Sequence, residues 1–429
     1  MGGVVVRSYL ELLRLPGAWQ FSLAGFIARY PMAMMAMSTA LVIPVFYHNY
    51  TLAGQLAAIS ITSFAICAPV LSKLVDRYGQ FRVLSKTIAI FGISVFLLAG
   101  LIWAHMPGWV LALAIIPVGG FSGAIGAMVR SRWALKVTRP GQLTQAFALE
   151  AALDEVAFAT GPMFATVLVT AVHPLAGLIA CGVIQVCGGY AFIAQRSSEP
   201  KPQREVTDIP PAAKSSVLRS KAIIVLGVTY AGAGAIFGAL DLAAVAFATE
   251  HGARGMAGVM LGICSIGSLL GALFYGARQW PLSQGKLFII GIVVLAVGNI
   301  VVLLAQSMVS LSIILFFMGI SIAPTMTNVN AMVQRIVHPS RLTEGLTWLS
   351  TFMNIGVGIG AAVGGRMIDV SGSRGGLMVM AASAVIMLAI AIGCAPILRK
   401  SLHRADRRRQ IALDLQAEAQ RRAGHEQAA

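Results

Sequence analysis

The sequence predicts an all-α membrane protein in which twelve transmembrane helices form two pseudo-symmetric six-helix halves. Composition is the first reason. Of the 429 residues, 57% are hydrophobic and only 11% are charged, so the chain is far more apolar than a soluble domain. The second reason is that the apolar residues gather in long runs separated by short polar loops. The third is that segments late in the chain repeat the residue spacing of earlier ones.

Each expected helix is an apolar run long enough to cross a bilayer, which takes about 20 residues. The twelve runs span 20–46, 52–74, 84–105, 109–129, 145–170, 175–194, 221–248, 256–276, 285–305, 309–333, 344–368 and 375–397. Residues 1–19 lack the short apolar core and small-residue cleavage site of a removable signal peptide, so we expect no such peptide.

Positive charge is concentrated in the loops on one side of these helices. Basic residues follow helices two, four, eight and ten: Lys73, Arg77, Arg82, Lys86, Arg130, Arg132, Lys136, Arg139, Arg278, Lys286, Arg335 and Arg341. The other side carries only Arg254, Arg366 and Arg374. The positive-inside rule then places both termini on the cytoplasmic side of a bacterial-type inner membrane. This pattern explains the net charge of +16 without a nucleic-acid partner.

Composition also divides the chain into regions. We expect an N-terminal half over 1–195, a polar, proline-rich cytoplasmic linker over 196–220, a C-terminal half over 221–398 and a basic cytoplasmic tail over 399–429. The five cysteines lie singly inside apolar runs, and no glycine-lysine-serine phosphate loop occurs. We therefore expect no metal site, no nucleotide and no other cofactor.

The two halves repeat each other in helices four and five against ten and eleven. Aligning 142–162 with 341–361 without a gap sets Gly161 on Gly360. Two related halves suit a binding site at their interface that opens alternately to each side of the membrane. The register also shows that charge is concentrated in the first half. Met353 and Asn354 stand where the first half has Asp154 and Glu155, and Ala233 stands where it has Arg29.

The loop after helix two, SKLVDRYGQFR over 72–82, resembles a signature of the major facilitator superfamily. Asp76, Arg77, Gly79 and Arg82 match that signature, and Ser72 replaces its first glycine. The resemblance covers the twelve-helix plan and implies a secondary transporter that works by alternating access. It also implies that Asp76 lies near the start of helix eleven and stabilises one conformation. The alternative is that Asp76 and Arg77 are ordinary solvated loop charges.

Other matches to the superfamily are less extensive. Gly161-Pro162 in helix five resembles the core of a motif associated with antiporters, although Ala165-Thr166 replace the glycine pair that follows it. The segments ARYP, RSRW and LDEVAFATGP resemble a group of actinobacterial-type facilitators. The Gly-Pro pair favours export.

Helix five carries three acids inside a hydrophobic run. Glu150 and Asp154 fall on one stripe of the helix, whereas Glu155 is turned roughly 100° away from Asp154. A charge in a bilayer costs about 2.5–3.5 kcal/mol, so these acids need a polar partner or water. Arg29 in helix one reaches a similar depth, and helices one and five are neighbours in the family that the chain resembles. We therefore expect Arg29 to pair with Asp154 or Glu155.

Three acids facing one arginine leave at least one carboxyl without a partner. Such a group could take up and release a proton, with Glu150 the first candidate and Glu155 the second. Two other roles for this cluster stay open. It could lock helices one and five together or line a water-filled cavity, or it could contact substrate directly.

Further polar and flexible side chains mark a possible cavity. Methionines crowd the middle of helix one, and Met32 and Met35 could line an adaptable binding site or simply pack against lipid and core. Asp241 lies towards the outer end of helix seven, where we expect a rim or capping charge or an outer part of the translocation path. Pro31 and Pro44 offer places for helix one to bend.

The sequence thus predicts a secondary transporter rather than an enzyme. We expect proton-coupled export of an amphipathic or apolar small molecule, with uptake or facilitated diffusion of a polar metabolite as the alternative. A membrane sensor without transport activity is a third class. The expected partners are a small-molecule substrate, protons and the lipid bilayer, and the sequence leaves the oligomeric state open.

Overall fold

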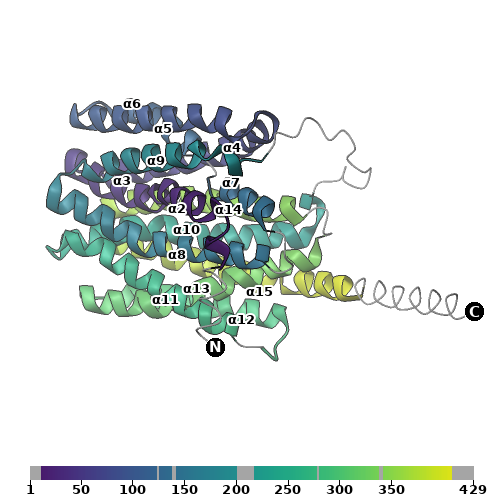
Figure 1. Cartoon of the computed structure of the whole chain (residues 1–429). Coiled ribbons are helices and arrows are strands. Elements are labelled where there is room, and N and C mark those ends of the chain that lie inside the picture. The colour runs from purple at the N-terminus through teal and green to yellow at the C-terminus, as the bar shows by residue number, and fades with distance from the viewer. Residues whose placement is uncertain are drawn as a thin grey trace, which may run out of the picture.

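The computed structural model describes residues 11–122, 125–137, 142–200, 217–277, 280–337 and 342–407. Within these ranges the chain is a bundle of long helices that run side by side, without strands (Figure 1). Among the described residues, twelve helices are long and apolar enough to span a membrane. They match the twelve predicted runs, so the predicted fold class is confirmed.

The first half contains helices one to six. They are α2 (Ala18–Arg29) with α3 (Pro31–Tyr47), α4 (Tyr50–Tyr78), α5 (Gln80–Trp103), α6 (Gly108–Phe121) with α7 (Ile125–Lys136), α8 (Gln142–Val167) with the π-helical turn Leu168–Val172, and α9 (Ala176–Ala194). Helix one is broken at Tyr30, where Pro31 starts α3. Pro31 is one of the two prolines at which a bend was expected. The helix breaks there because proline lacks the N–H that a continuous helix needs.

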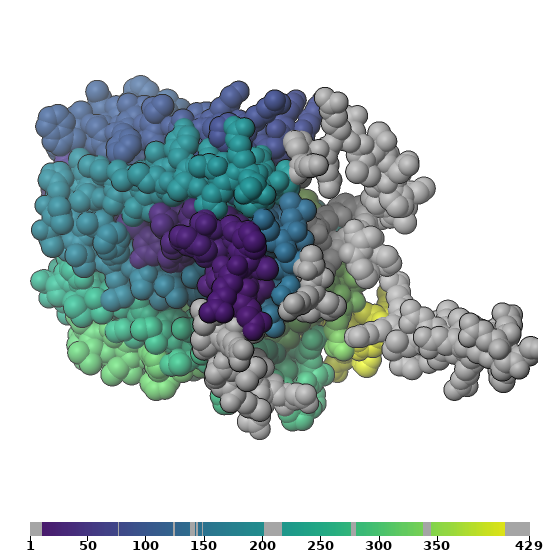
Figure 2. Space-filling model, in the orientation of Figure 1, coloured from purple at the N-terminus to yellow at the C-terminus, as the bar shows by residue number. Residues whose placement is uncertain are grey.

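The second half contains helices seven to twelve. They are α10 (Lys221–Glu250), α11 (Ala257–Ala277), α12 (Gln284–Val301), α13 (Met308–Ile336), α14 (Leu342–Ser371) and α15 (Ser373–Gly393). Figure 2 shows the two halves as neighbouring blocks, with the purple-to-teal first half above the green second half. Residues 201–216 of the predicted linker and 408–429 of the predicted tail lie outside the described residues, so the domain boundaries stay predictions.

The two halves touch through α4 against α14 and α8 against α11. Small residues let the backbones approach closely: a β-carbon at Gly54 would lie 2.1 Å from the carbonyl oxygen of Ala361. At the same end of the bundle, Asp369 of α14 accepts hydrogen bonds from the backbone N–H groups of Tyr50 (2.9 Å) and Thr51 (2.6 Å), the first residues of α4. A carboxylate at a helix N-terminus satisfies otherwise unpaired N–H donors.

Candidate functional site

A cavity of about 410 Å³ lies in the first half, against one helix of the second. Its walls come mainly from helix one, α4, α6, α7 and α8, with single residues from α5, α9 and, in the second half, Asn354 of α14. Met32 and Met35 both line it, as does Arg29, where helix one breaks. This volume falls in the range of small-molecule sites. Asn354 is the residue that the repeat sets opposite Glu155, so the second half contributes a neutral side chain here.

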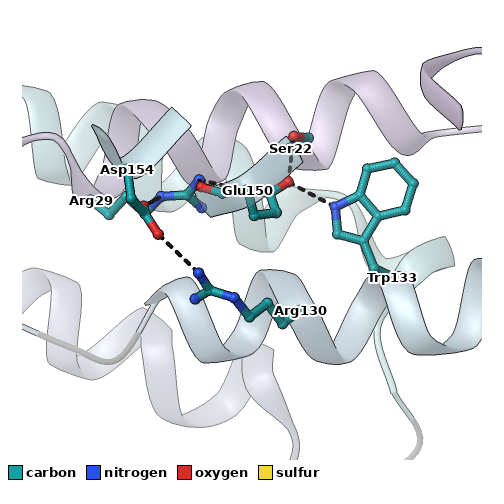
Figure 3. Close-up of polar contacts among 6 residues, drawn as sticks. All are labelled: Ser22, Arg29, Arg130, Trp133, Glu150 and Asp154. Atoms are coloured by element: carbon teal, nitrogen blue, oxygen red, sulfur yellow. Dashed lines mark hydrogen bonds and ion pairs between the residues drawn. The ribbon is translucent and has the colours of Figure 1, made fainter. Parts of the chain in front are cut away.

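Glu150 is fully buried and accepts three hydrogen bonds. The donors are Arg29 Nη2 at 2.5 Å, Ser22 Oγ at 2.6 Å and Trp133 Nε1 at 2.7 Å. Figure 3 shows these side chains converging from helix one, α7 and α8. Because a buried carboxylate needs such compensation, this arrangement fits an ionised Glu150 that joins three helices.

Asp154 lies one helical turn beyond Glu150 and pairs with two arginines. Arg29 Nε lies 2.6 Å from Asp154 Oδ1, and Arg130 Nη2 donates to Asp154 Oδ2 at 2.9 Å (Figure 3). Asp154 and Arg130 are about one-third exposed, at 28% and 35% of their side-chain surface, and both line the cavity. The network therefore runs from the buried Glu150 through Arg29 to a carboxylate that a ligand can reach.

Of the two acids expected as partners of Arg29, Asp154 forms the ion pair and Glu155 does not; Glu150, the first candidate for the acid without a partner, is also paired with Arg29, so that expectation is wrong. The guanidinium is a fork with five N–H donors, and two acids on one helix stripe can occupy two of its edges. Arg130 and Trp133 are partners that were not expected from the sequence. Their i, i+3 spacing on helix four was the available signal, because it puts them on one face.

Glu155 is the one of the three acids of α8 that does not pair with an arginine among the described residues. It makes no hydrogen bond or ion pair with the residues that the structure describes, and it lies beside the negative charge of Asp154. Its helix stripe continues through Ala159 and Met163, which pack against Gly262 of α11. Glu155 thus belongs to the face of α8 that meets the second half.

Asp241 does not occupy the rim that the sequence suggested. It lies about nine residues before the end of α10, roughly 13 Å at 1.5 Å per residue, between the buried Leu240 and Leu242. It does not line the cavity, and among the described residues it has no hydrogen-bond or ion-pair partner. The capping charge at that end is Glu250, which accepts hydrogen bonds from the backbone and hydroxyl of Ser373 at the start of α15.

The structure describes most of the loop signature over residues 72–82. The side chain of Asp76 lies outside the described residues, so its predicted role in one conformation stays a prediction. Arg77 lies over the ring of Tyr78, and the side chain of Arg82 is exposed. Gly79 joins α4 to α5 with a φ of 90°, a left-handed conformation that favours glycine.

Gly161 and Pro162 lie where three helices cross. A β-carbon at Gly161 would lie 2.8 Å from the Ala33 side chain of helix one, and one at Gly258 of α11 would lie 2.4 Å from the Pro162 carbonyl oxygen. The pair therefore supports close packing of α8 against helix one and against the second half. Its connection with antiport stays a prediction.

The comparisons with known proteins identify a family from the sequence and a fold from solved structures. A family model described as Major Facilitator Superfamily matches residues 21–277 and 224–423. No curated protein sequence matches the chain.

Three solved structures illustrate the likeness in fold. The nucleoside transporter NupG, as a mutant, superposes with a TM-score of 0.69 at 12% identity, covering 90% of this chain and 99% of that one. A bacterial homologue of the iron transporter ferroportin in an inward-facing state gives 0.68 at 15% identity, covering 89% and 99%. A bacterial homologue of the human lysosomal transporter Spinster, inward-facing and unoccupied, gives 0.64 at 13% identity, covering 90% and 96%. Identities this low carry information about the fold alone.

Proposed function

Since the chain belongs to the Major Facilitator Superfamily, we propose that it is a secondary transporter that exports an amphipathic small molecule across the cytoplasmic membrane in exchange for protons. The observation that carries this proposal is the cavity of the first half, which reaches Asn354 of the second and joins apolar walls to an intramembrane ion network. Most of its wall is apolar, including Phe64 and Phe158, whereas Gln185 and Asn354 add hydrogen-bonding groups. Such a wall suits a molecule with an apolar body and a polar end.

Alternating access requires the two halves to separate where they now touch. The halves meet at the end of the bundle that carries Tyr50, Arg254 and Asp369, where Arg254 also donates to the Leu41 carbonyl oxygen of helix one. The lysine and arginine distribution supports placing this end outside the cell. We therefore assign the structure to a state that is closed on the outside.

Glu155 is the proposed proton carrier, since Glu150 and Asp154 are both paired with arginine. α11 and α3, which pack against α8, carry no charged residue. The charged groups on the other elements packed against it are Arg29 on α2, Arg130, Arg132 and Lys136 on α7, and Arg254 in the short 3₁₀ helix Arg254–Met256 before α11; Glu150 and Asp154 lie on α8 itself. A carboxyl without an ion-pair partner in this setting can bind and release a proton as the halves move.

The test uses proteoliposomes and compounds that raise the melting temperature of the purified protein, because a ligand stabilises the state it binds. For the wild type we expect an imposed pH gradient to drive accumulation of such a compound. Glu155→Gln should lose this accumulation and keep exchange of labelled for unlabelled compound, since exchange needs no proton. Loss of both, or of neither, contradicts the assignment of Glu155.

Asp241→Asn is the matched comparison, because Asp241 is the other intramembrane acid without a partner among the described residues. We expect it to retain the proton-driven accumulation. If Asp241→Asn instead shows the pattern expected of Glu155→Gln, the proton carrier is in helix seven. A wild type that shows no response to the gradient rules out proton coupling.

A further inference from the structure

The charges that a ligand can reach in the cavity do not balance. Arg29, Arg130 and Asp154 line the cavity, which amounts to two positive charges and one negative. Glu150 supplies the fourth charge of the network, but it has no exposed surface and lies behind Arg29. A molecule in the cavity therefore meets an excess of positive charge, although the network as a whole is neutral.

Arg29 also has an unused donor. Its Nη2 donates to Glu150, and its Nε forms an ion pair with Asp154, but Nη1 is buried and has no hydrogen-bond partner among the described residues. Arg29 as a whole is 8% exposed. A buried donor left unpaired is unfavourable, so an acceptor brought to this position by a ligand would be favoured.

Asp154 is the only acid that Arg130 contacts among the described residues, and it is shared with Arg29. Two guanidinium groups around one carboxylate form a site for an oxyanion, since planar N–H pairs match the geometry of a carboxylate or phosphate. An anion entering the cavity could occupy the same place as Asp154 does now. A cationic ligand would be attracted by one carboxylate but repelled by two guanidinium groups.

We infer that the transported molecule is an amphipathic organic anion whose oxyanion binds between Arg29 and Arg130, in competition with Asp154. Its apolar body would lie along Met32, Met35 and Phe158, which line the same cavity. This inference rests on the proposed function and names the substrate class of the same site. Asp154 becomes the group that holds the two arginines when no substrate is bound.

Binding to the purified protein in nanodiscs tests the inference with compounds that differ only in the polar end. One set is phenylbutanoate, phenylbutanamide and phenylbutylamine, and a second is indole acetate, indole acetamide and tryptamine. We expect the two acids to bind, and the amides to bind about tenfold more weakly, because a neutral amide forms weaker hydrogen bonds with guanidinium groups than a carboxylate does. Amines binding more tightly than acids, or acids not binding at all, would overturn the inference.

Substitutions of single residues test whether the preference for acids arises at Arg130 and Asp154. Arg130→Gln should weaken binding of the acids by about tenfold to a hundredfold and leave the amides unchanged. Asp154→Asn should tighten binding of the acids, because it removes the competing carboxylate. Lys136→Gln is the control: it removes one positive charge from the same helix, but Lys136 does not line the cavity. An equal loss of acid binding in Lys136→Gln and Arg130→Gln contradicts a local site.

Arg130→Lys provides a second variant if Arg130→Gln does not fold. It keeps the charge and should retain the preference for acids over amides, with weaker binding because the fork of donors is lost. Transport of whichever compounds bind separates the two proposals. Amides or amines that bind more tightly than the acids and are transported leave the proposed function intact and refute an anionic substrate. If no compound of any class is bound, the anion inference fails, whereas the proposed function still stands or falls with the proton-driven accumulation described above.

Discussion

Helices one and five of the first half correspond in the repeat to helices seven and eleven of the second, yet different forces join them. In the first half, Arg29 forms ion pairs with Glu150 and Asp154 across the contact. In the second half, glycines bring the two backbones together. β-Carbons at Gly356 and Gly360 of α14 would lie 1.9 Å and 2.0 Å from carbonyl oxygens of α10.

The difference indicates which half can respond to a ligand. An ion pair can exchange one charged partner for another, so a contact built from charges can be changed by a substrate or a proton. A contact between two backbones leaves no room for another group. We therefore interpret α10 with α14 as a rigid unit and the pair of helix one and α8 as the adaptable one. The following predictions test this contrast.

The largest effect is expected from Arg29→Ala. It leaves the fully buried Glu150 without its cationic partner, and breaking a buried ion pair in this way costs about 3–5 kcal/mol of the free energy of unfolding. Adding Glu150→Gln should recover part of the loss, because the stranded charge is removed. Denaturant unfolding in detergent, followed by tryptophan fluorescence, measures both variants.

Arg366→Ala is the control for Arg29→Ala, since Arg366 is an exposed arginine of the second half. Surface substitutions of this kind usually change stability by less than about 0.5 kcal/mol. An Arg29→Ala protein as stable as Arg366→Ala would mean that the ion network does not hold the first half together.

A smaller effect is expected from the glycine contact of the second half. Gly360→Ala places a methyl group 2.0 Å from the backbone oxygen of Ala235, so the helices must move apart, and we expect a loss of about 3 kcal/mol. Gly161→Ala, its counterpart in the repeat, meets the Ala33 side chain at 2.8 Å and should lose about 1 kcal/mol. Equal losses in the same unfolding measurement would remove the contrast between the halves.

The smallest effect is expected where the halves touch each other. Asp369→Ala removes the cap on α4, which belongs to the other half, and a cap is worth about 0.5–2 kcal/mol. Because this cap exists only while the two halves meet, its loss should move the population several-fold towards the state that is open at this end. Distances between spin labels at the Tyr50 end of α4 and the Asp369 end of α14 report the populations.

Glu250→Ala is the matched control for Asp369→Ala. Glu250 also caps a helix, α15, but both partners belong to the second half. It should therefore lower stability without moving the distance between the halves. A shift of the same size in both variants would mean that Asp369 contributes to folding and has no part in closing this end.

The sequence alone determined the membrane class, the positions of the twelve spans, the repeat and the presence of intramembrane charges in helices one and five. These are local properties, because the length of an apolar run and the cost of a charge within it can be evaluated without knowing the neighbours. Helical periodicity also placed Glu150 and Asp154 on one stripe. It could not distinguish the acid that is paired from the acid that is not.

Only the tertiary structure decided the partners. Glu150 is paired because Ser22, Arg29 and Trp133 reach it from two other helices. Asp369 caps a helix that begins more than 300 residues earlier in the chain. Periodicity fixes the direction of a side chain around its own helix axis. Which group it meets depends on how the helices pack against one another, and that arrangement is a property of the whole bundle.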